Sequence, residues 1–236
     1  MNVDVDVDVD GFPRTLPSTS SPPSDACYDD SVNEAGAIGP TLDAPPDPDR
    51  VDHCVTFRRV SWEQYEALLG TRGESDLPRM TFLRGTLHVM SPSAAHDSIS
   101  RMFVRVLGVV AEEMGIDLNA FGSWTLKAEP ERGLEPDESF VLGERSKPVP
   151  DLAIEVLWTS KIADKLEVYR GLRVPEVWCW EAGAIAVFVL RDDRYERVLR
   201  SALLPALDLE LVARIVVRKD QRKAIQELRE SLRRAS

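Results

Sequence analysis

The sequence predicts a mixed α/β fold in which helices flank a central mixed β-sheet. Short strand-like segments alternate with two longer segments whose apolar residues recur at helical spacing, and no internal repeat is visible. Strands interleaved with helices pack as layers around a shared core. The chain has 236 residues, of which 43% are hydrophobic and 29% charged, so it is long enough for one such domain and too short for two full ones.

Residues 1–50 differ in composition from the rest of the chain. They hold eight of the sixteen prolines and 11 of the 40 acidic residues, but only 2 of the 29 basic ones. They therefore carry −9 of the net charge of −11, and residues 51–236 are nearly neutral. Such a segment buries too little apolar surface to fold, so we expect a disordered acidic, proline-rich tail. The Val-Asp alternation at residues 3–10 has the period of a strand, but its like charges favour a solvated tail.

The composition also bears on location and partners. Cys27, Cys54 and Cys179 are odd in number and form no CxxC pair, which argues against a disulfide framework and a structural zinc site. The longest apolar run, Ala182 to Leu190, has nine residues, about half of the roughly 18 to 20 needed to cross a bilayer. We therefore expect a soluble cytoplasmic protein without a membrane partner.

The ordered part is expected to begin near Val51. A first short helix follows Ser61, which forms a capping box with Gln64, and it ends near Gly70. Residues 79–84 and 86–91, joined by Gly85, predict a hairpin.

A long helix is predicted over residues 97–114, because seven apolar residues recur there at helical spacing before Gly115. A second helix is predicted over Lys161–Gly171, with Ile162, Leu166 and Tyr169 on its apolar face. The strands expected around these two helices are 122–127, 137–142, 151–157, 176–180, 184–190 and 195–199.

The C-terminal segment, residues 216–236, is predicted to form a separate helix that follows a domain at 51–215. Its residues Ala224, Ile225, Leu228 and Leu232 recur at helical spacing among arginines and glutamates. An apolar stripe of this kind suits a docking or coiled helix, which makes a homodimer an expectation.

Two acidic residues fall on facing strands of a predicted hairpin. Asp137 opens one strand, Glu155 lies late in the next, and Gly143–Val149 forms the loop between them. If Leu142 pairs with Pro150, the antiparallel register places Asp137 directly opposite Glu155. Opposed Cβ atoms lie about 4.5–5.5 Å apart, close enough for two carboxylates to share a divalent cation.

Other interpretations of these acids remain open. Asp151 is on the same strand face as Glu155, but four residues separate the two by roughly 13 Å, so we interpret Asp151 as a strand-start or supporting residue. Asp137 and Glu155 could instead face solvent or pair with Lys or Arg. Two unpaired carboxylates at this distance are costly, which favours a metal or another cation between them.

A lysine and a histidine are further candidates. Lys161 and Lys165 lie four residues apart on the predicted helix, and Lys165 lies four residues before Tyr169 at the edge of the apolar stripe. Lys165 could therefore point toward the sheet, or extend along the helix surface as ordinary lysines do. His96 precedes the long helix, where a histidine is most often a cap or surface residue.

Four segments in this order resemble the Uma-two family of restriction-endonuclease-like proteins, a branch of the PD-(D/E)xK nucleases. They are RMTFLRGTLHVMSPSAAH, RGLEPDESF, VPDLAIEVLWTS and DKLEVYRGLRVPEVWCW. The resemblance runs from about Val60 to Ile215 and implies a restriction-endonuclease-like core with a magnesium-type site at the hairpin. It assigns metal binding to Asp137 and Glu155, the pair that register also selects. Leu157 stands where the superfamily lysine would be, and the resemblance places that lysine at Lys165.

These observations lead us to expect a metal-dependent nuclease acting on DNA. Asp137 and Glu155 would hold Mg²⁺ or Mn²⁺ with a strand carbonyl near Val156, Lys165 would orient the attacking water and offset charge, and His96 would assist. One alternative is a non-catalytic nucleic-acid-binding or regulatory module with the same fold. Another is an interaction protein that works through its acidic tail and C-terminal helix.

Overall fold

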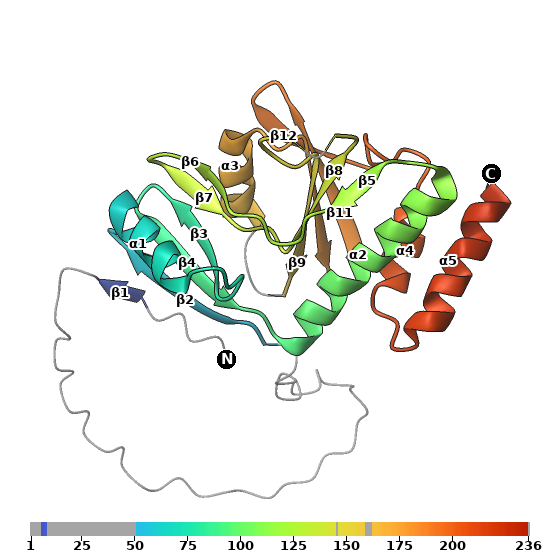
Figure 1. Cartoon of the computed structure of the whole chain (residues 1–236), viewed down its shortest axis with the longest axis horizontal. Coiled ribbons are helices and arrows are strands. Elements are labelled where there is room, and N and C mark those ends of the chain that lie inside the picture. The colour runs from blue at the N-terminus through green and yellow to red at the C-terminus, as the bar shows by residue number, and fades with distance from the viewer. Residues whose placement is uncertain (1–5, 9–50, 145, 159–161, 236) are drawn as a thin grey trace, which may run out of the picture.

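The computed structural model describes residues 6–8, 51–144, 146–158 and 162–235. The mixed α/β class is confirmed, but the strands form two sheets where one was predicted (Figure 1). Within the described ranges, the first sheet has the order β1 (Asp6–Asp8), β2 (His53–Arg58), β4 (Thr86–Ser91), β3 (Arg79–Leu83), β7 (Arg132–Leu134) and β6 (Leu126–Ala128). The second has the order β12 (Arg194–Val198), β11 (Ala184–Arg191), β10 (Glu176–Glu181), β9 (Leu152–Leu157), β8 (Glu138–Leu142) and β5 (Leu118–Ala120).

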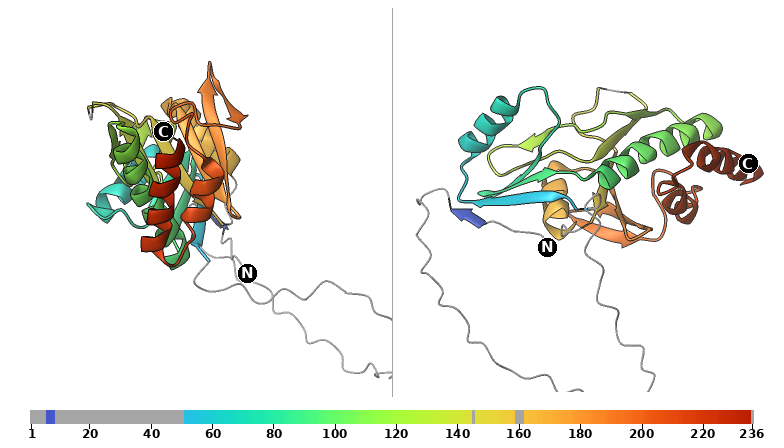
Figure 2. Two further views of the ribbon diagram at one scale, coloured as in Figure 1. Left: turned by 90° about the vertical axis from the view of Figure 1, so that its right-hand side faces the viewer. Right: turned by 90° about the horizontal axis from the view of Figure 1, so that it is seen from below.

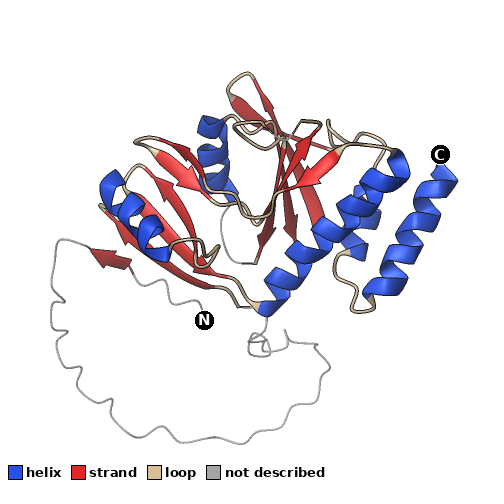
Figure 3. Ribbon diagram, viewed as in Figure 1, coloured by secondary structure: helices blue, strands red, loops and turns tan. Residues whose placement is uncertain are grey.

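The helices cover the two sheets differently. They are α1 (Trp62–Arg72), α2 (Ala94–Met114), α3 (Ile162–Leu172), α4 (Leu209–Ile215) and α5 (Gln221–Ala235). Apolar residues of α2, α4 and α5 form one core with one face of the second sheet. Helix α3 shares another core with the opposite face of that sheet and with β6 and β7 of the first. Figure 3 shows this arrangement, with α3 between the two groups of strands.

Local sequence signals explain most element boundaries. Ser61 caps α1, and Gln64 completes the predicted capping box. Gly115 ends α2 in the left-handed conformation, as expected of a helix C-terminus. Arg84 and Gly85 both have positive φ in the turn between β3 and β4, the geometry that a two-residue hairpin requires. The predicted helices and the first hairpin are thereby confirmed.

One strand prediction was wrong. Of the predicted strand 122–127, residues 122–125 are not strand, and only Leu126 and Lys127 belong to one, the short β6. Gly122 has a φ of +65°, its carbonyl accepts a hydrogen bond from the Ser139 hydroxyl, and Phe121 stacks on Trp124. These interactions hold the segment as a loop against β8. Strands β2, β5 and β7 and helix α4 were not predicted.

The two ends of the chain give different results. The predicted tail, residues 1–50, lies outside the described residues except for Asp6–Asp8, which form strand β1 parallel to β2. This strand differs from the solvated interpretation of the Val-Asp run, because β2 offers it unpaired backbone groups at the sheet edge. At the other end, α5 buries Ala224, Ile225 and Leu228 in the core with α2 and α4 (Figure 2).

The packing of α5 accounts for its apolar stripe within one chain. The homodimer therefore stays a prediction, and the stripe on which it depended has an intramolecular explanation. No helix among the described residues has the length and apolar character needed to span a membrane. The expected cytoplasmic location also stays a prediction.

Candidate active site

Strands β8 and β9 bring Asp137 and Glu155 together in the predicted register. The ladder pairs Glu138 with Ile154 and Phe140 with Leu152, and one further step places Asp137 opposite Glu155. Both side chains are buried, with residue exposures of 1% and 0%. The two faces of β9 also follow the prediction, since Ile154 lies in the core below α2 and Ala153 in the core below α3.

Asp137 is held by three groups from three elements. Its Oδ2 accepts the backbone N–H of Val156 at 2.7 Å and lies 2.9 Å from Nε2 of His96. Its Oδ1 accepts a hydrogen bond from Nη1 of Arg79 at 2.7 Å. Burial would raise the pKa of Asp137, but the positive charges of His96, Lys165 and Arg79 hold it well below its ordinary value.

His96 is a buried link between two carboxylates rather than a surface residue. It lies in the first turn of α2, where its backbone N–H donates to the hydroxyl of the N-cap residue Ser93 at 3.2 Å. Its Nδ1 lies 2.8 Å from Oδ2 of Asp52 while Nε2 contacts Asp137. Burial would lower the pKa of His96, but the charges of Asp137 and Asp52 and the hydrogen bonds to them raise it to about 9. A protonated ring donates to both acids.

Glu155 has two partners on α3, which follows it in the chain. Nζ of Lys165 donates to Oε2 at 2.5 Å, and the hydroxyl of Tyr169 donates to Oε1. The Lys165 side chain is 14% exposed, so it points toward the sheet and does not extend along the helix surface. Burial would lower the pKa of Lys165, but Glu155 and Asp137 raise it, which keeps the amine charged. Burial raises the pKa of Glu155, with Lys165 opposing the shift.

The charges in this cluster balance without an added ion. Asp52, Asp137 and Glu155 are matched by Arg79, Lys165 and protonated His96. Each oxygen of Asp137 and Glu155 has a protein partner. Within the described ranges, no three His, Cys, Asp or Glu side chains are grouped to hold a metal ion. At Val156, the group that contacts Asp137 is the N–H and not the carbonyl.

Three of these residues were not singled out from the sequence as site residues, namely Asp52, Arg79 and Tyr169. Asp52 precedes β2 and Arg79 begins β3, so both come from the first sheet and reach the acids only through tertiary packing. Tyr169 was predicted on the apolar face of α3, four residues after Lys165, and that spacing was the one local signal for its role. Lys161, by contrast, lies outside the described residues.

Asp151 and Glu138 have other surroundings. Asp151 accepts hydrogen bonds from the N–H of Leu142 at 2.7 Å and from the amine of Lys147 at 2.7 Å, which closes the hairpin loop and agrees with a strand-start role.

Glu138 is 2% exposed. Burial raises its pKa to about 7, and the charges of Arg101 and Arg79 oppose this shift. It follows Asp137 directly and is therefore part of the site's electrostatic environment.

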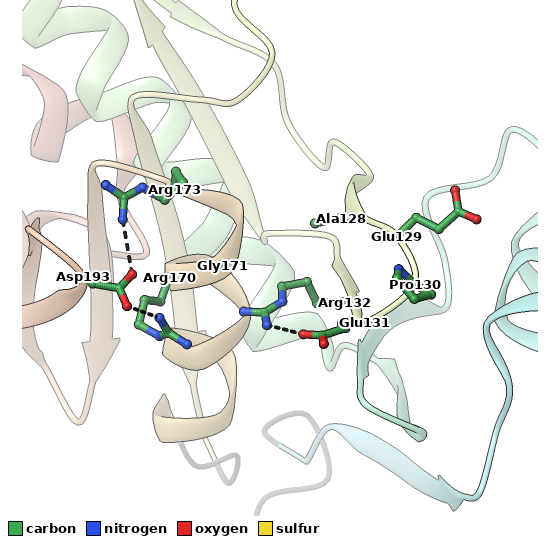
Figure 4. Close-up of a pocket in the computed structure, with 9 residues that line it drawn as sticks. All are labelled: Ala128, Glu129, Pro130, Glu131, Arg132, Arg170, Gly171, Arg173 and Asp193. Carbon is green, nitrogen blue, oxygen red and sulfur yellow. Dashed lines mark hydrogen bonds and ion pairs between the residues drawn. The ribbon is translucent and has the colours of Figure 1, made fainter.

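A pocket of about 370 Å³ lies at the C-terminal end of α3, and neither Asp137 nor Glu155 lines it (Figure 4). Arg132, Arg170 and Arg173 line it together with acidic side chains. Arg170 and Arg173 both bind Asp193, and Arg132 binds Glu131. Because these arginines already have carboxylate partners, the pocket offers no uncompensated positive charge.

Comparison with known proteins identifies the family. None of the curated proteins matches the chain. A solved structure from Anabaena variabilis, described as a "putative nuclease belonging to DUF820", is 16% identical with a TM-score of 0.49, covering 67% of this chain and 99% of that one. The model of the Uma2 family, described as "Putative restriction endonuclease", matches residues 62–217. Since this match spans most of the chain and contains Asp137, Glu155 and Lys165, the protein belongs to the Uma2 family.

Proposed function

We propose that this protein is a metal-dependent nuclease that hydrolyses phosphodiester bonds of DNA. The observation that carries the proposal is the contact between Lys165 and Glu155 opposite Asp137, in a chain that belongs to a restriction-endonuclease family. Two acids and a lysine at one place are the groups that a nuclease needs to hold a cation, position water and offset charge.

The donor set fits a hard divalent cation such as Mg²⁺ or Mn²⁺. Carboxylate oxygens are the ligands that these ions prefer, and Asp137 and Glu155 supply them from adjacent strands. Protein cations lie 2.7 Å from Asp137 and 2.5 Å from Glu155, which indicates that the pair stabilises positive charge. Asp137 and Glu155 would hold the ion, with the Val156 carbonyl as a further ligand. A bound ion of this kind polarises the phosphate and lowers the pKa of its water.

The chain's own residues have distinct tasks in this proposal. Lys165 stays protonated because the charges of Glu155, which it contacts, and of Asp137 raise its pKa, so it orients the water and stabilises charge on the phosphate rather than removing a proton. Tyr169 fixes the other oxygen of Glu155. His96 holds Asp137 from the first turn of α2, and Asp52, which precedes β2, holds the other side of the His96 ring. His96 is therefore a positioning residue.

A second candidate is a non-catalytic nucleic-acid-binding or regulatory module. The balanced charges favour it, because the buried acids are satisfied by protein groups alone. Tight binding of nucleic acid without turnover is the behaviour expected of such a module.

The test is incubation with supercoiled plasmid, single-stranded DNA and RNA in Mg²⁺, Mn²⁺ or EDTA. We expect DNA cleavage that requires the metal and is lost in a Glu155→Gln variant prepared in parallel. Binding without cleavage under all metal conditions would replace the proposal by the second candidate.

A further inference from the structure

Arg79 joins the first sheet to the acid pair of the second. It is the first residue of β3, and its side chain is 7% exposed. Nη1 donates to Oδ1 of Asp137 at 2.7 Å and lies 3.4 Å from Nε2 of His96. A buried guanidinium therefore lies directly against one of the two acids, on a different element from Lys165, which contacts the other.

Most donors of this guanidinium are unused. An arginine side chain has five N–H donors in a planar fork, yet among the described residues only Nη1 of Arg79 has a hydrogen-bond partner. Its Nε is buried and has none. Buried donors such as this Nε are normally satisfied. Nη2 also has no hydrogen-bond partner among the described residues, so the terminal donors left over at the acid pair suggest a polar partner that belongs to a ligand.

Arg72, the last residue of α1, is a nearby arginine whose contacts are structural alone. Its Nη1 and Nη2 both bind the carboxylate of Glu135, and Nη1 also binds the Pro78 carbonyl. The Nε of Arg72 also lacks a partner, so the difference between the two residues lies in the terminal nitrogens. Both terminal nitrogens of Arg72 bind a carboxylate, whereas only one terminal nitrogen of Arg79 does.

We propose that Arg79 is a phosphate-binding catalytic residue that contacts the phosphodiester under attack. The proposal rests on the proposed function and extends it. Guanidinium groups bind phosphate oxygens in a bidentate manner. The unused donors of Arg79 lie beside Asp137, and Lys165 contacts the other acid, Glu155. A cation bound by Asp137 would compete with Arg79 for Oδ1, which leaves more of the fork for phosphate.

The experiment compares Arg79→Lys with the matched control Arg72→Lys. Lysine keeps the charge and one donor but loses the fork. We expect Arg79→Lys to lower kcat about a hundredfold, the effect of removing one preorganised donor to a developing charge. Its affinity for Mn²⁺, measured by calorimetry, should be equal to or higher than that of the wild type. Arg72→Lys should lower the melting temperature and leave kcat of the folded enzyme near the wild-type value.

Two further readouts separate phosphate binding from support of Asp137. Activity of Arg79→Ala should rise when guanidinium is added. If Arg79→Lys melts below the assay temperature, this rescue is the test of whether the guanidinium group itself is needed. Binding of a fluorescent DNA duplex in EDTA should be weaker for Arg79→Lys than for the wild type, which tests the arginine even if the wild type proves inactive. Wild-type kcat in Arg79→Lys, loss of Mn²⁺ affinity in proportion to kcat, or absence of guanidinium rescue would each overturn the inference.

Discussion

Lys165, the fourth residue of α3, places its amine 2.5 Å from Oε2 of Glu155, which lies ten residues earlier in the chain. In the PD-(D/E)xK pattern that the sequence resembles, a lysine stands two residues after the second acid, and here that position is Leu157, which is buried in the core that α3 shares with the sheet. A leucine there packs against α3, and α3 returns the amine to the acid. The strand position can therefore be apolar without loss of the amine, because α3 both packs on Leu157 and supplies Lys165 to Glu155.

Tyr169→Phe should destabilise the protein by about 1–3 kcal/mol, because it leaves a buried oxygen of Glu155 without a donor. Tyr195→Phe is the matched control, since that hydroxyl donates to the Val174 carbonyl at 2.6 Å and not to either acid. Urea denaturation of both variants measures the difference. Equal losses, or a smaller loss for Tyr169→Phe, would show that the hydroxyl does not support Glu155.

Gly171→Ala should cost roughly 1–3 kcal/mol of stability, because an added Cβ would overlap the guanidinium of Arg132. Arg132 is buried and bound to Glu131 and to the Glu167 carbonyl, so it cannot move without losing those contacts. In Gly70→Ala, by contrast, no atom lies within 4 Å of the new Cβ. This helical control should be up to about 1 kcal/mol more stable than the wild type, and thermal melting of both variants tests the contrast.

Docking of α5 should weaken in acid. Hydrogen bonds from Arg233 and Arg229 lower the pKa of Glu113 on α2 from its ordinary 4.5 to about 2. A carboxylate whose pKa is lowered by folding adds stability above its unfolded pKa and loses it as the pH falls through the folded pKa. The stability advantage of the wild type over Glu113→Gln should therefore be complete above about pH 4.5 and shrink toward pH 2. Melting curves across this range check it, and an advantage that does not change with pH would contradict it.

The sequence was sufficient to predict the acid pair because local rules determine a hairpin. The loop length between the two strands sets the register, and the register places Asp137 opposite Glu155. For Lys165 the helical stripe left two orientations open, and the resemblance to the Uma-two family selected the one toward the sheet. These inferences use residues within about 30 positions of one another, where pairing and periodicity still limit the possible geometry.

Contacts between distant segments could not be predicted in this way. Arg79 and Asp52 reach Asp137 and His96 from the first sheet, and nothing local in their segments indicates which acid or histidine they meet. The division into two sheets was missed for the same reason. Strands such as β7 have three residues, too few for alternation to be recognised, and they pair with β3 about fifty positions away.

The most direct test of the proposed active site is the rate of plasmid nicking in Mg²⁺ by Lys165→Met, compared with the wild type and Lys147→Met. Lys147 also binds an acid of this hairpin, Asp151, but at the far end of the loop. We expect Lys165→Met to lose about a hundredfold or more in rate, as for other preorganised electrostatic groups, and to remain folded, while Lys147→Met stays near the wild-type rate. Equal rates for the two variants would contradict the assignment of Lys165 and Glu155 to catalysis.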